Sequence, residues 1–508
     1  MIQVVNIVPK SLSGDTNQDS EPNLAVNPSN PMQIAATAFT PDPLGGANAP
    51  LFVSNDGGQT WRLNPIVPSQ AGRATGDITV RFSPKGGRLY AGILRFPGSL
   101  RLNILRTNNF LGASAMTVLV DRNGVDQPYV EVGSPTTGPD AGKDRVFVGD
   151  NSLAASSGSG GDGRTARIEV SEDGAVAAPP PASGFSSVKI ESRSTSGQDG
   201  PPIRPAVHDD GTVYGAFYHW TSFDSSTGKA TVGVVVVRDD NWGSGATPFT
   251  ALNDPSDHVA GRLVASGRTL PFLNTSQPTF GQERLVGSDL TIAVDPRNSA
   301  NVWLGWADRV GAADYTLHVR HSTDKGVTWS NDVRTITNAK SPALAVNNTG
   351  QVGFLYQQVT GGGAAQRWVT HFERTNDAFA TIDDKVLATV PANSPAPTFL
   401  PYLGDYLHLM SVGATFFGIF SAANIPDHAN FPQGVVYQRN SDFASKTLFD
   451  IDGHTPVSAS IDPFFFKVTA DVPVPHTPVP PVPHTPVPPV PHTPVPPVPH
   501  TPVPPVPH

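Results

Sequence analysis

One eight-residue pattern occurs twice and limits the folds open to this chain. Both copies read Ser-x-Asp-x-Gly-x-Thr-Trp, at Ser54–Trp61 and at Ser322–Trp329. The hydroxyl and carboxylate side chains can bond the N–H groups of their own turn, glycine supplies a positive φ, and tryptophan can cover the base of a hairpin. The octads therefore predict two tight turns of one type, with structural roles for Ser54, Asp56, Gly58, Thr60, Trp61, Ser322, Asp324, Gly326, Thr328 and Trp329.

A longer unit, made of a strand, a tight polar turn and a second strand, recurs along the chain. Its seven copies begin at Glu21, Gly76, Asp126, Ile203, Ser288, Ser341 and Thr398. A second hairpin follows each copy, and degenerate octads occur near residues 105, 170, 237, 373 and 438. Such four-stranded units bury their faces only by stacking radially. We predict an all-β, seven-bladed β-propeller over residues 1–470, with the strand Ile2–Val8 closing the last blade. Six blades with one inserted repeat is the alternative.

Charge and composition exclude several classes of partner. The net charge is −9, which argues against nucleic acid and anionic membranes. The chain has no run of about 18 apolar residues that could span a bilayer. Its first residues lack the basic and apolar segments of a secretion signal. The absence of cysteine rules out disulfides and thiolate metal sites.

The two octads resemble the Asp-box, or bacterial neuraminidase repeat, of the sialidase-like propellers. The segments EPNLAVNPSNP and LTIAVDPRNSANVWLGWAD, and GDYLHL from Gly404, are similar to exo-sialidase-like repeat proteins. The resemblance covers roughly residues 20–445. It implies the propeller fold and a ligand face at the starts of the first strands. It does not specify a reaction, since one fold serves many functions.

Acidic residues stand at that position in most repeats. Five of them form the predicted ring at the channel mouth: Glu21, Asp77, Asp126, Asp289 and Asp405. Asp199 is a further acidic residue at this position, and the sixth repeat has Lys340 there. Three interpretations remain open: solvated or loop-capping carboxylates, a calcium site, and a catalytic carboxylate pair. No DxDxDG calcium loop is present.

The sialidase reaction can be compared with the residues directly. In that family three arginines clamp the substrate carboxylate, and the first lies in an Arg-Ile-Pro motif that is absent here. Arg204 stands before Pro205, Arg309 and Arg320 lie in the fifth repeat, and Tyr402 and Tyr406 in the seventh. Order and spacing differ from the family pattern, so Arg204, Arg320, Asp405 and Tyr406 are only weak catalytic candidates. We expect Arg204 to pair with an acidic neighbour, and we expect no sialidase activity.

The chain ends in proline-rich repeats. From Val472 to His508 the unit PVPPVPHT recurs with a period of eight. This composition favours polyproline II and cannot form a core. A stiff spacer, an O-glycosylated stalk and an assembly connector all fit the repeats. The expected second domain is residues 471–508.

Three classes of function fit the sequence. The first is a non-catalytic propeller that recognises glycan or protein outside the cell or at its surface, with the tail as stalk or connector. The others are a sialidase-like glycoside hydrolase and a structural subunit of an extracellular filament or coat. The missing arginine motif favours the first.

Overall fold

The computed structural model describes residues 2–41, 44–46, 48, 50–96, 98, 100–152, 165–171, 184–194, 203–270, 290–310, 314–396 and 402–469. Contacts divide the chain into two compact units, Met1–Ala470 and Asp471–His508. The tail repeats belong to the second unit, which lies outside the described residues.

The first unit is built of β-sheets, and six of them share one plan of four antiparallel strands in chain order. Their strands are β2 (Ser20–Val26), β3 (Ile34–Phe39), β4 (Leu51–Ser54) and β5 (Arg62–Leu63); β6 (Ala74–Phe82), β7 (Leu89–Phe96), β8 (Arg101–Thr107) and β9 (Thr117–Asn123); β10 (Val125–Gly133), β11 (Arg145–Ser152), β12 (Thr165–Ser171) and β13 (Phe185–Lys189); β14 (Arg204–Val207), β15 (Val213–Asp224), β16 (Lys229–Asp239) and β17 (Arg262–Leu270); β18 (Leu290–Asp295), β19 (Asn298–Val310), β20 (Asp314–Ser322) and β21 (Arg334–Thr337); and β22 (Ala339–Val346), β23 (Val352–Thr360), β24 (Arg367–Thr375) and β25 (Asp383–Pro391).

A further sheet contains both ends of the first unit. Its order is β26 (His408–Val412), β27 (Thr415–Ala423), β32 (Ile461–Thr469), β1 (Val4–Asn6) and β28 (Val435–Tyr437). Strand β1 pairs antiparallel with β32 and parallel with β28. A small sheet of β29 (Ser441–Asp442), β30 (Thr447–Phe449) and β31 (Pro456–Val457) follows β28 in the chain, and three short 3-10 turns are η1 (Lys10–Leu12), η2 (Gly363–Ala365) and η3 (His428–Asn430). The described residues contain no α-helix.

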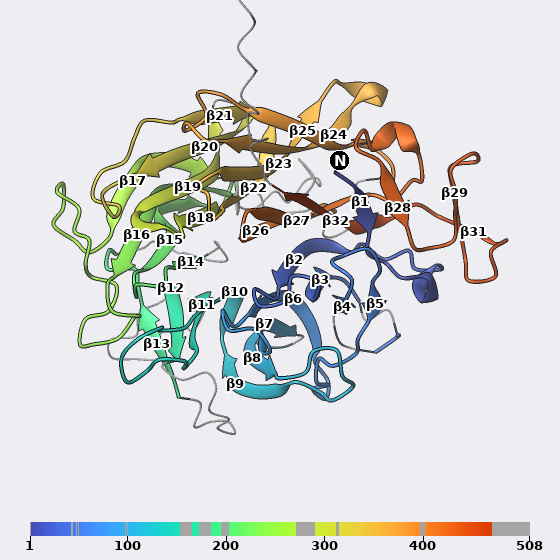
Figure 1. Cartoon of the computed structure of the whole chain (residues 1–508). Helices are drawn as coiled ribbons and strands as arrows, with labels where there is room; N and C mark the ends of the chain where they lie inside the picture. The colour runs from blue at the N-terminus through green and yellow to red at the C-terminus, as the bar shows by residue number, and fades with distance from the viewer. Residues whose placement is uncertain are drawn as a thin grey trace, which may run out of the picture. The chain divides into compact units, whose positions relative to one another are not determined.

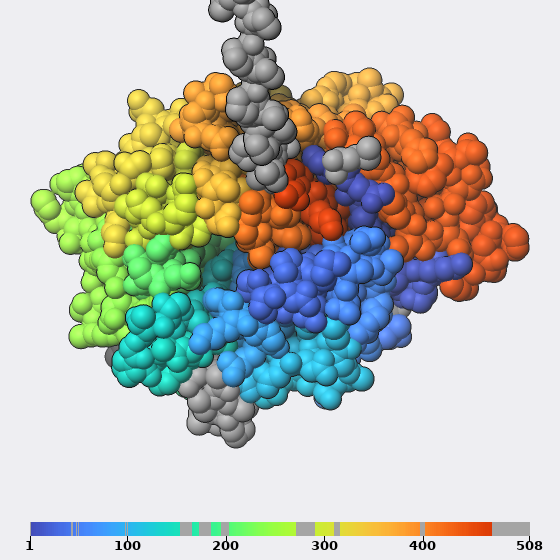
Figure 2. All heavy atoms as spheres, viewed as in Figure 1, coloured from blue at the N-terminus to red at the C-terminus, as the bar shows by residue number. Residues whose placement is uncertain are grey.

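The sheets are arranged radially, as Figure 1 shows. The first strand of each sheet contacts the first strand of the next, from β2 through β6, β10, β14, β18 and β22 to β26, and β26 contacts β2 again. In the space-filling view the colours follow the same order around a hollow near the middle (Figure 2). This is the architecture of a β-propeller, and it confirms the predicted all-β class.

Neighbouring sheets pack face to face through apolar side chains. Between the sheets that begin with β14 and β18, the core includes the fully buried Trp220 and Trp306. Between β22–β25 and the closing sheet, Phe372 packs against Phe416 and Phe466. Because alternate residues of a strand point to opposite faces, each sheet contributes to two such layers. Each sheet therefore depends on the neighbouring sheets to bury its apolar faces, as the sequence repeat predicts.

Both octads form one hydrogen-bonded turn. The Ser54 hydroxyl donates to Asp56 Oδ1 and accepts from the Gly58 N–H at 3.0 Å, while Asp56 Oδ1 accepts from the N–H of Thr60 at 3.0 Å. Ser322 and Asp324 repeat these bonds. The Nε1 atom of each tryptophan donates to the octad glycine's carbonyl, at 3.0 Å for Trp61 and 3.1 Å for Trp329.

Glycine is required in the first turn for two reasons. Gly58 has a φ of 90°, and an added Cβ would lie 2.1 Å from the Phe465 ring. That ring belongs to β32 and packs against Trp61 at 5.5 Å between centroids. The first octad therefore joins its own hairpin to the closing sheet.

A degenerate octad at Thr375 forms the same turn. Thr375 takes the serine position, and Asp377 Oδ1 accepts from the Thr381 N–H at 2.9 Å. Phe379 stands where glycine stands in the full octads, with a φ of 66°, and its N–H donates to the Thr375 hydroxyl. Its buried ring packs against Trp303 and Phe354, and this packing offsets the strain of the left-handed conformation.

Candidate functional site

The first strand of each sheet is its inner strand, next to the central channel. At the starts of several inner strands the pairing register is irregular, and this directs side chains toward the channel. Register shifts occur at the start of β2, β6, β10 and β22. Within them Glu21, Gln127 and Ser341 have φ values of 51°, 54° and 53°, and each precedes a proline. Proline suits a bulge because it donates nothing to the ladder, and bulges commonly re-aim side chains near functional sites.

Seven polar residues meet at this end of the inner strands, and we call them the mouth cluster: Glu21, Asp77, Gln127, Tyr129, Arg204, Asp405 and Tyr406. They come from β2, β6, β10, β14 and the segment just before β26. Their carboxyl, amide, guanidinium and phenol groups supply both donors and acceptors of hydrogen bonds.

Three carboxyl groups of the mouth cluster are buried together. Glu21, Asp77 and Asp405 are each 5% exposed. The side chains of Glu21 and Asp77 are hydrogen-bonded to each other, and Glu21 Oε1 accepts from the Asp405 N–H at 3.0 Å. Burial, with the charges of Asp405 and Asp77, raises the pKa of Glu21 well above its usual value, and burial also raises the pKa of Asp77. The two hydrogen-bonded carboxyls therefore share a proton.

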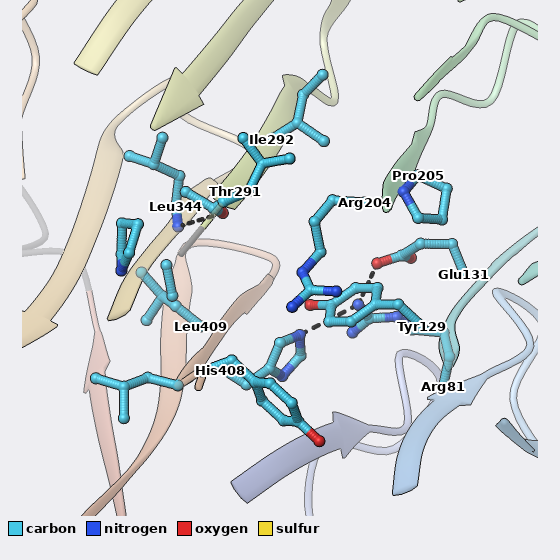
Figure 3. Close-up of a pocket in the computed structure, with 15 residues that line it drawn as sticks. Arg81, Tyr129, Glu131, Arg204, Pro205, Thr291, Ile292, Leu344, His408 and Leu409 are labelled. Carbon is cyan, nitrogen blue, oxygen red and sulfur yellow. Dashed lines mark hydrogen bonds and ion pairs between the residues drawn. The ribbon is translucent and has the colours of Figure 1, made fainter. Parts of the chain in front are cut away.

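Arg204 and two tyrosines form the aromatic part of the cluster. The guanidinium of Arg204 lies 4.3 Å from the centre of the Tyr129 ring and 5.5 Å from that of Tyr406. Figure 3 shows Arg204 beside Tyr129. The Tyr406 side chain is buried, and its hydroxyl has no hydrogen-bond partner among the described residues. Burial and the charges of Asp77 and Glu21 raise the pKa of Tyr406 well above its usual value, so the phenol stays protonated.

A second layer lies deeper in the channel. Arg81 forms an ion pair with Glu131, and its Nη2 atom lies 3.2 Å from His408 Nε2. The Leu24 N–H faces the other ring nitrogen, Nδ1, at 3.3 Å. Burial and the charge of Arg81 lower the pKa of His408 well below its usual value. The ring is therefore neutral, and Figure 3 shows it beside Arg81.

Two cavities follow the channel. The first, of about 50 Å³, is lined by Tyr129, Arg204, Tyr406 and His408 and by apolar side chains from β18 and β22. The second, of about 240 Å³, lies toward the ends of the inner strands and is lined by the Arg81–Glu131 ion pair, Ser411 and apolar side chains. Arg81 and Glu131 line both cavities, so their ion pair stands between them.

The structure brings together three of the five predicted ring residues, Glu21, Asp77 and Asp405. The carboxylate of Asp126 accepts from the N–H of the next residue, Gln127, at 2.8 Å. From this strand it is Gln127 that faces the cluster, donating from Nε2 to Asp405 Oδ2 at 3.3 Å. The bulge in β10 accounts for the shift by one residue. Asp289 and Asp199 lie outside the described residues.

Of the four weak catalytic candidates, some lie in the mouth cluster and one lies outside it. Arg204, Asp405 and Tyr406 lie in the mouth cluster, but Arg320 does not. It belongs to β20, the third strand of its sheet, where it pairs with Asp332 at 2.7 Å and donates to the Val264 carbonyl. Arg204 stacks on tyrosine rings, and it also interacts electrostatically with the acidic residues Asp405 and Asp77.

Arg81, Tyr129, Glu131 and His408 were missed as channel residues. Their signal was alternation: in QPYVEVG, from Gln127, polar residues alternate with valines that lie in the core between sheets. A period of two on an inner strand places alternate side chains toward the channel.

The predicted calcium site gains no support from the described residues. Among them, no group of three or more His, Asp or Glu side chains is placed to hold a metal ion. No described helix is long and apolar enough to cross a membrane.

Comparison with known proteins adds the likeness of the fold. No family model and no curated protein match the sequence, so the Asp-box family remains a resemblance. An α-L-arabinanase of Penicillium chrysogenum complexed with arabinobiose has 12% identity and a TM-score of 0.40, over 91% of this chain and 98% of that one. An endosialidase of phage phi92 has 13% identity and a TM-score of 0.40, over 92% and 69%. A Hadza microbial sialidase has 14% identity and a TM-score of 0.36, over 79% and 63%. Likenesses this distant carry no information about substrate.

Proposed function

We propose that the protein is a seven-bladed β-propeller that binds a glycan at the mouth cluster without cleaving it. Six four-stranded sheets and one five-stranded closing sheet, joined in a ring by their first strands, support the count of seven. We place the protein outside the cell or at its surface, with residues 1–470 as the binding domain and residues 471–508 as a stalk or assembly connector.

One observation carries the proposal of a ligand. Tyr406 lines the first cavity, and its buried hydroxyl, which feels the charges of Asp77, Glu21 and Arg204, has no partner among the described residues. An unsatisfied buried hydroxyl costs about 1–3 kcal/mol. Such a cost is tolerated where a ligand completes the hydrogen bonds. A sugar hydroxyl is suitable because it both donates and accepts, and the adjoining tyrosine ring offers an apolar face.

The carboxyl spacing supports binding rather than hydrolysis. Glycosidases hold their two carboxyl groups about 5–5.5 Å or 6.5–9.5 Å apart, depending on stereochemistry. Glu21 and Asp77 do not face each other across an open space, since their side chains are directly hydrogen-bonded. They resemble a pair that shares one proton, not an acid facing a nucleophile.

The test is a glycan array with the full chain, followed by calorimetry on Tyr406→Phe. This variant removes only the unpartnered hydroxyl, so we expect unchanged or higher thermal stability and at least about ten-fold weaker glycan binding. Tyr402→Phe is the matched control. Its hydroxyl donates to the Pro395 carbonyl at 3.0 Å, so this variant should lose stability and keep affinity.

Two outcomes contradict the proposal. The first is an array on which no glycan binds. The second is a bound glycan whose affinity is the same for Tyr406→Phe and the unaltered protein.

A further inference from the structure

The mouth cluster already carries more negative than positive charge. Three carboxyl groups surround one guanidinium, and Arg204 interacts electrostatically with both Asp405 and Asp77. All four side chains are about 5% exposed, so screening by water is weak and each charge is strongly felt. Burial and the charges of Asp405 and Asp77 raise the pKa of Glu21 well above its usual value, so a further negative charge is disfavoured here.

The nearest other guanidinium cannot serve an anionic ligand. Arg81 is ion-paired with Glu131, its Nη2 faces His408, and its Nη1 lies 3.7 Å from the Met410 sulfur. A ligand carboxylate would have to displace Glu131, leaving that buried carboxylate without its partner. Removing one partner of a buried pair is strongly destabilising.

The buried lysine of the sixth sheet is also engaged. Lys340 is fully buried, and its Nζ donates to the Gly404 carbonyl at 2.5 Å. It fixes the segment that carries Asp405 and Tyr406, and it does not line either cavity.

With Arg81 and Lys340 already engaged, the groups left to contact a ligand at the mouth suit uncharged hydroxyl groups. Of the mouth cluster, Tyr129, Arg204 and Tyr406 line the first cavity, and Asp77 and Asp405 add negative charge beside Arg204 and Tyr406. The Tyr406 hydroxyl can donate or accept, and Arg204 donates. A sugar hydroxyl can meet each of these groups. A sugar carboxylate offers only acceptors, and it would bring a further negative charge beside Asp77 and Asp405.

We infer that the mouth cluster binds an uncharged sugar residue and rejects sugar acids, sialic acids included. The inference rests on the proposed function, since it names the class of glycan that the same site takes. It follows from the unpartnered Tyr406 hydroxyl, the three carboxyl groups and the two guanidinium groups already balanced by protein carboxylates.

The experiment compares matched neutral and acidic sugars by titration calorimetry with the full chain. The probes are galacto- and gluco-oligosaccharides, the corresponding galacturonate and glucuronate oligomers, and lactose beside 3′-sialyllactose. We expect a neutral probe to bind at least about ten-fold more tightly than its acidic counterpart, a difference that one unfavourable charge contact readily supplies.

A charge variant tests the cause. Asp77→Asn keeps the shape and removes one negative charge, so it should narrow the preference for the neutral sugar. Asp209→Asn, on the exposed turn after β14, changes the net charge equally and should leave the preference as it was.

The outcomes separate the two proposals. Tighter or equal binding of an acidic probe by the unaltered protein overturns this inference and leaves glycan binding standing. A preference that Asp77→Asn leaves unchanged also overturns it. Absence of binding to every probe and on the array overturns both.

Discussion

Glu21 combines several constraints in one residue. Its left-handed backbone lies in the bulge that opens β2, and its carboxyl contacts both Asp77 and the Asp405 N–H. An added Cβ on Gly404 would lie 2.1 Å from the Glu21 side chain, so glycine at that position permits the close approach. Left-handed non-glycine residues cost about 1–3 kcal/mol and concentrate at functional sites.

The proton held at Glu21 has a consequence for stability. Because its folded pKa is raised above 4.5, ionisation of the unfolded chain is favoured as the pH rises. Stability should fall between pH 4.5 and the folded pKa, by about 1.4 kcal/mol for each unit between the two values. Glu21→Gln keeps both hydrogen bonds and has no charge, so the decline should shrink or vanish.

Urea unfolding between pH 4 and pH 9 measures this difference. The control is Glu373→Gln, in a buried carboxylate that is ion-paired with Arg334 outside the mouth. Parallel stability curves for Glu21→Gln and the unaltered protein would show that the carboxyl pair does not share a proton.

At the level of the element, the Asp-box turn is the unit that repeats most closely. The pKa of Asp56 is lowered, since hydrogen bonds from Thr60 and Ser54 outweigh the opposing effect of burial. The carboxylates of Asp324 and Asp377 are held in the same way. The turn therefore depends on an ionised aspartate in all three places.

Removing that aspartate should destabilise the full and the degenerate turns alike. We expect Asp56→Ala and Asp377→Ala each to lower the free energy of unfolding measurably, through the loss of several turn hydrogen bonds. Asn55→Ala, at the exposed neighbouring position, is the control. If Asp377→Ala left the free energy of unfolding unchanged, packing of Phe379 alone would hold the degenerate turn.

The turns and the sheets could be predicted from sequence because their signals are local. The degenerate octad at Thr375 was found from Asp377 and the residues around it, and it forms the same bonds as the full octads. The mouth was predicted only in part. A bulge shifts the register by one residue, and a one-residue shift turns every side chain to the other face; hence Gln127 faces the cluster in place of Asp126.

The second layer shows a different limit. Arg81, Glu131 and His408 are far apart in the chain, and they meet only because three inner strands lie around one channel. Alternation indicates which face each side chain occupies. The pairing of Arg81 with Glu131 depends on which sheets are neighbours, and that follows from the closed ring.

For the whole molecule, the two compact units make a separable prediction. Deleting residues 471–508 should leave the melting temperature of the first unit unchanged, because Val, Pro, His and Thr repeats bury little surface of their own. Calorimetry of the full and truncated chains checks this.

If the tail connects subunits or anchors the protein, the truncated chain should also lose assembly or cell attachment, measured by sedimentation and by fractionation. A lower melting temperature would show that the propeller needs the tail.

The place of β1 has a further consequence, for the order in which the chain can fold as it is made. Val4 pairs with Phe466, and Val5 with Phe465, so the first strand completes a sheet whose other strands are translated last. Bringing such distant residues together carries the entropy of a very long loop, and folding dominated by non-local contacts is slow. The earlier sheets can form during synthesis. Until β28 and β32 are made, Val4–Asn6 lacks the strands with which it pairs, so its backbone edges stay open. A chain that stalls before Ile461–Thr469 would leave that strand available to pair with another chain, and secretion or chaperone binding during translation would have to protect it.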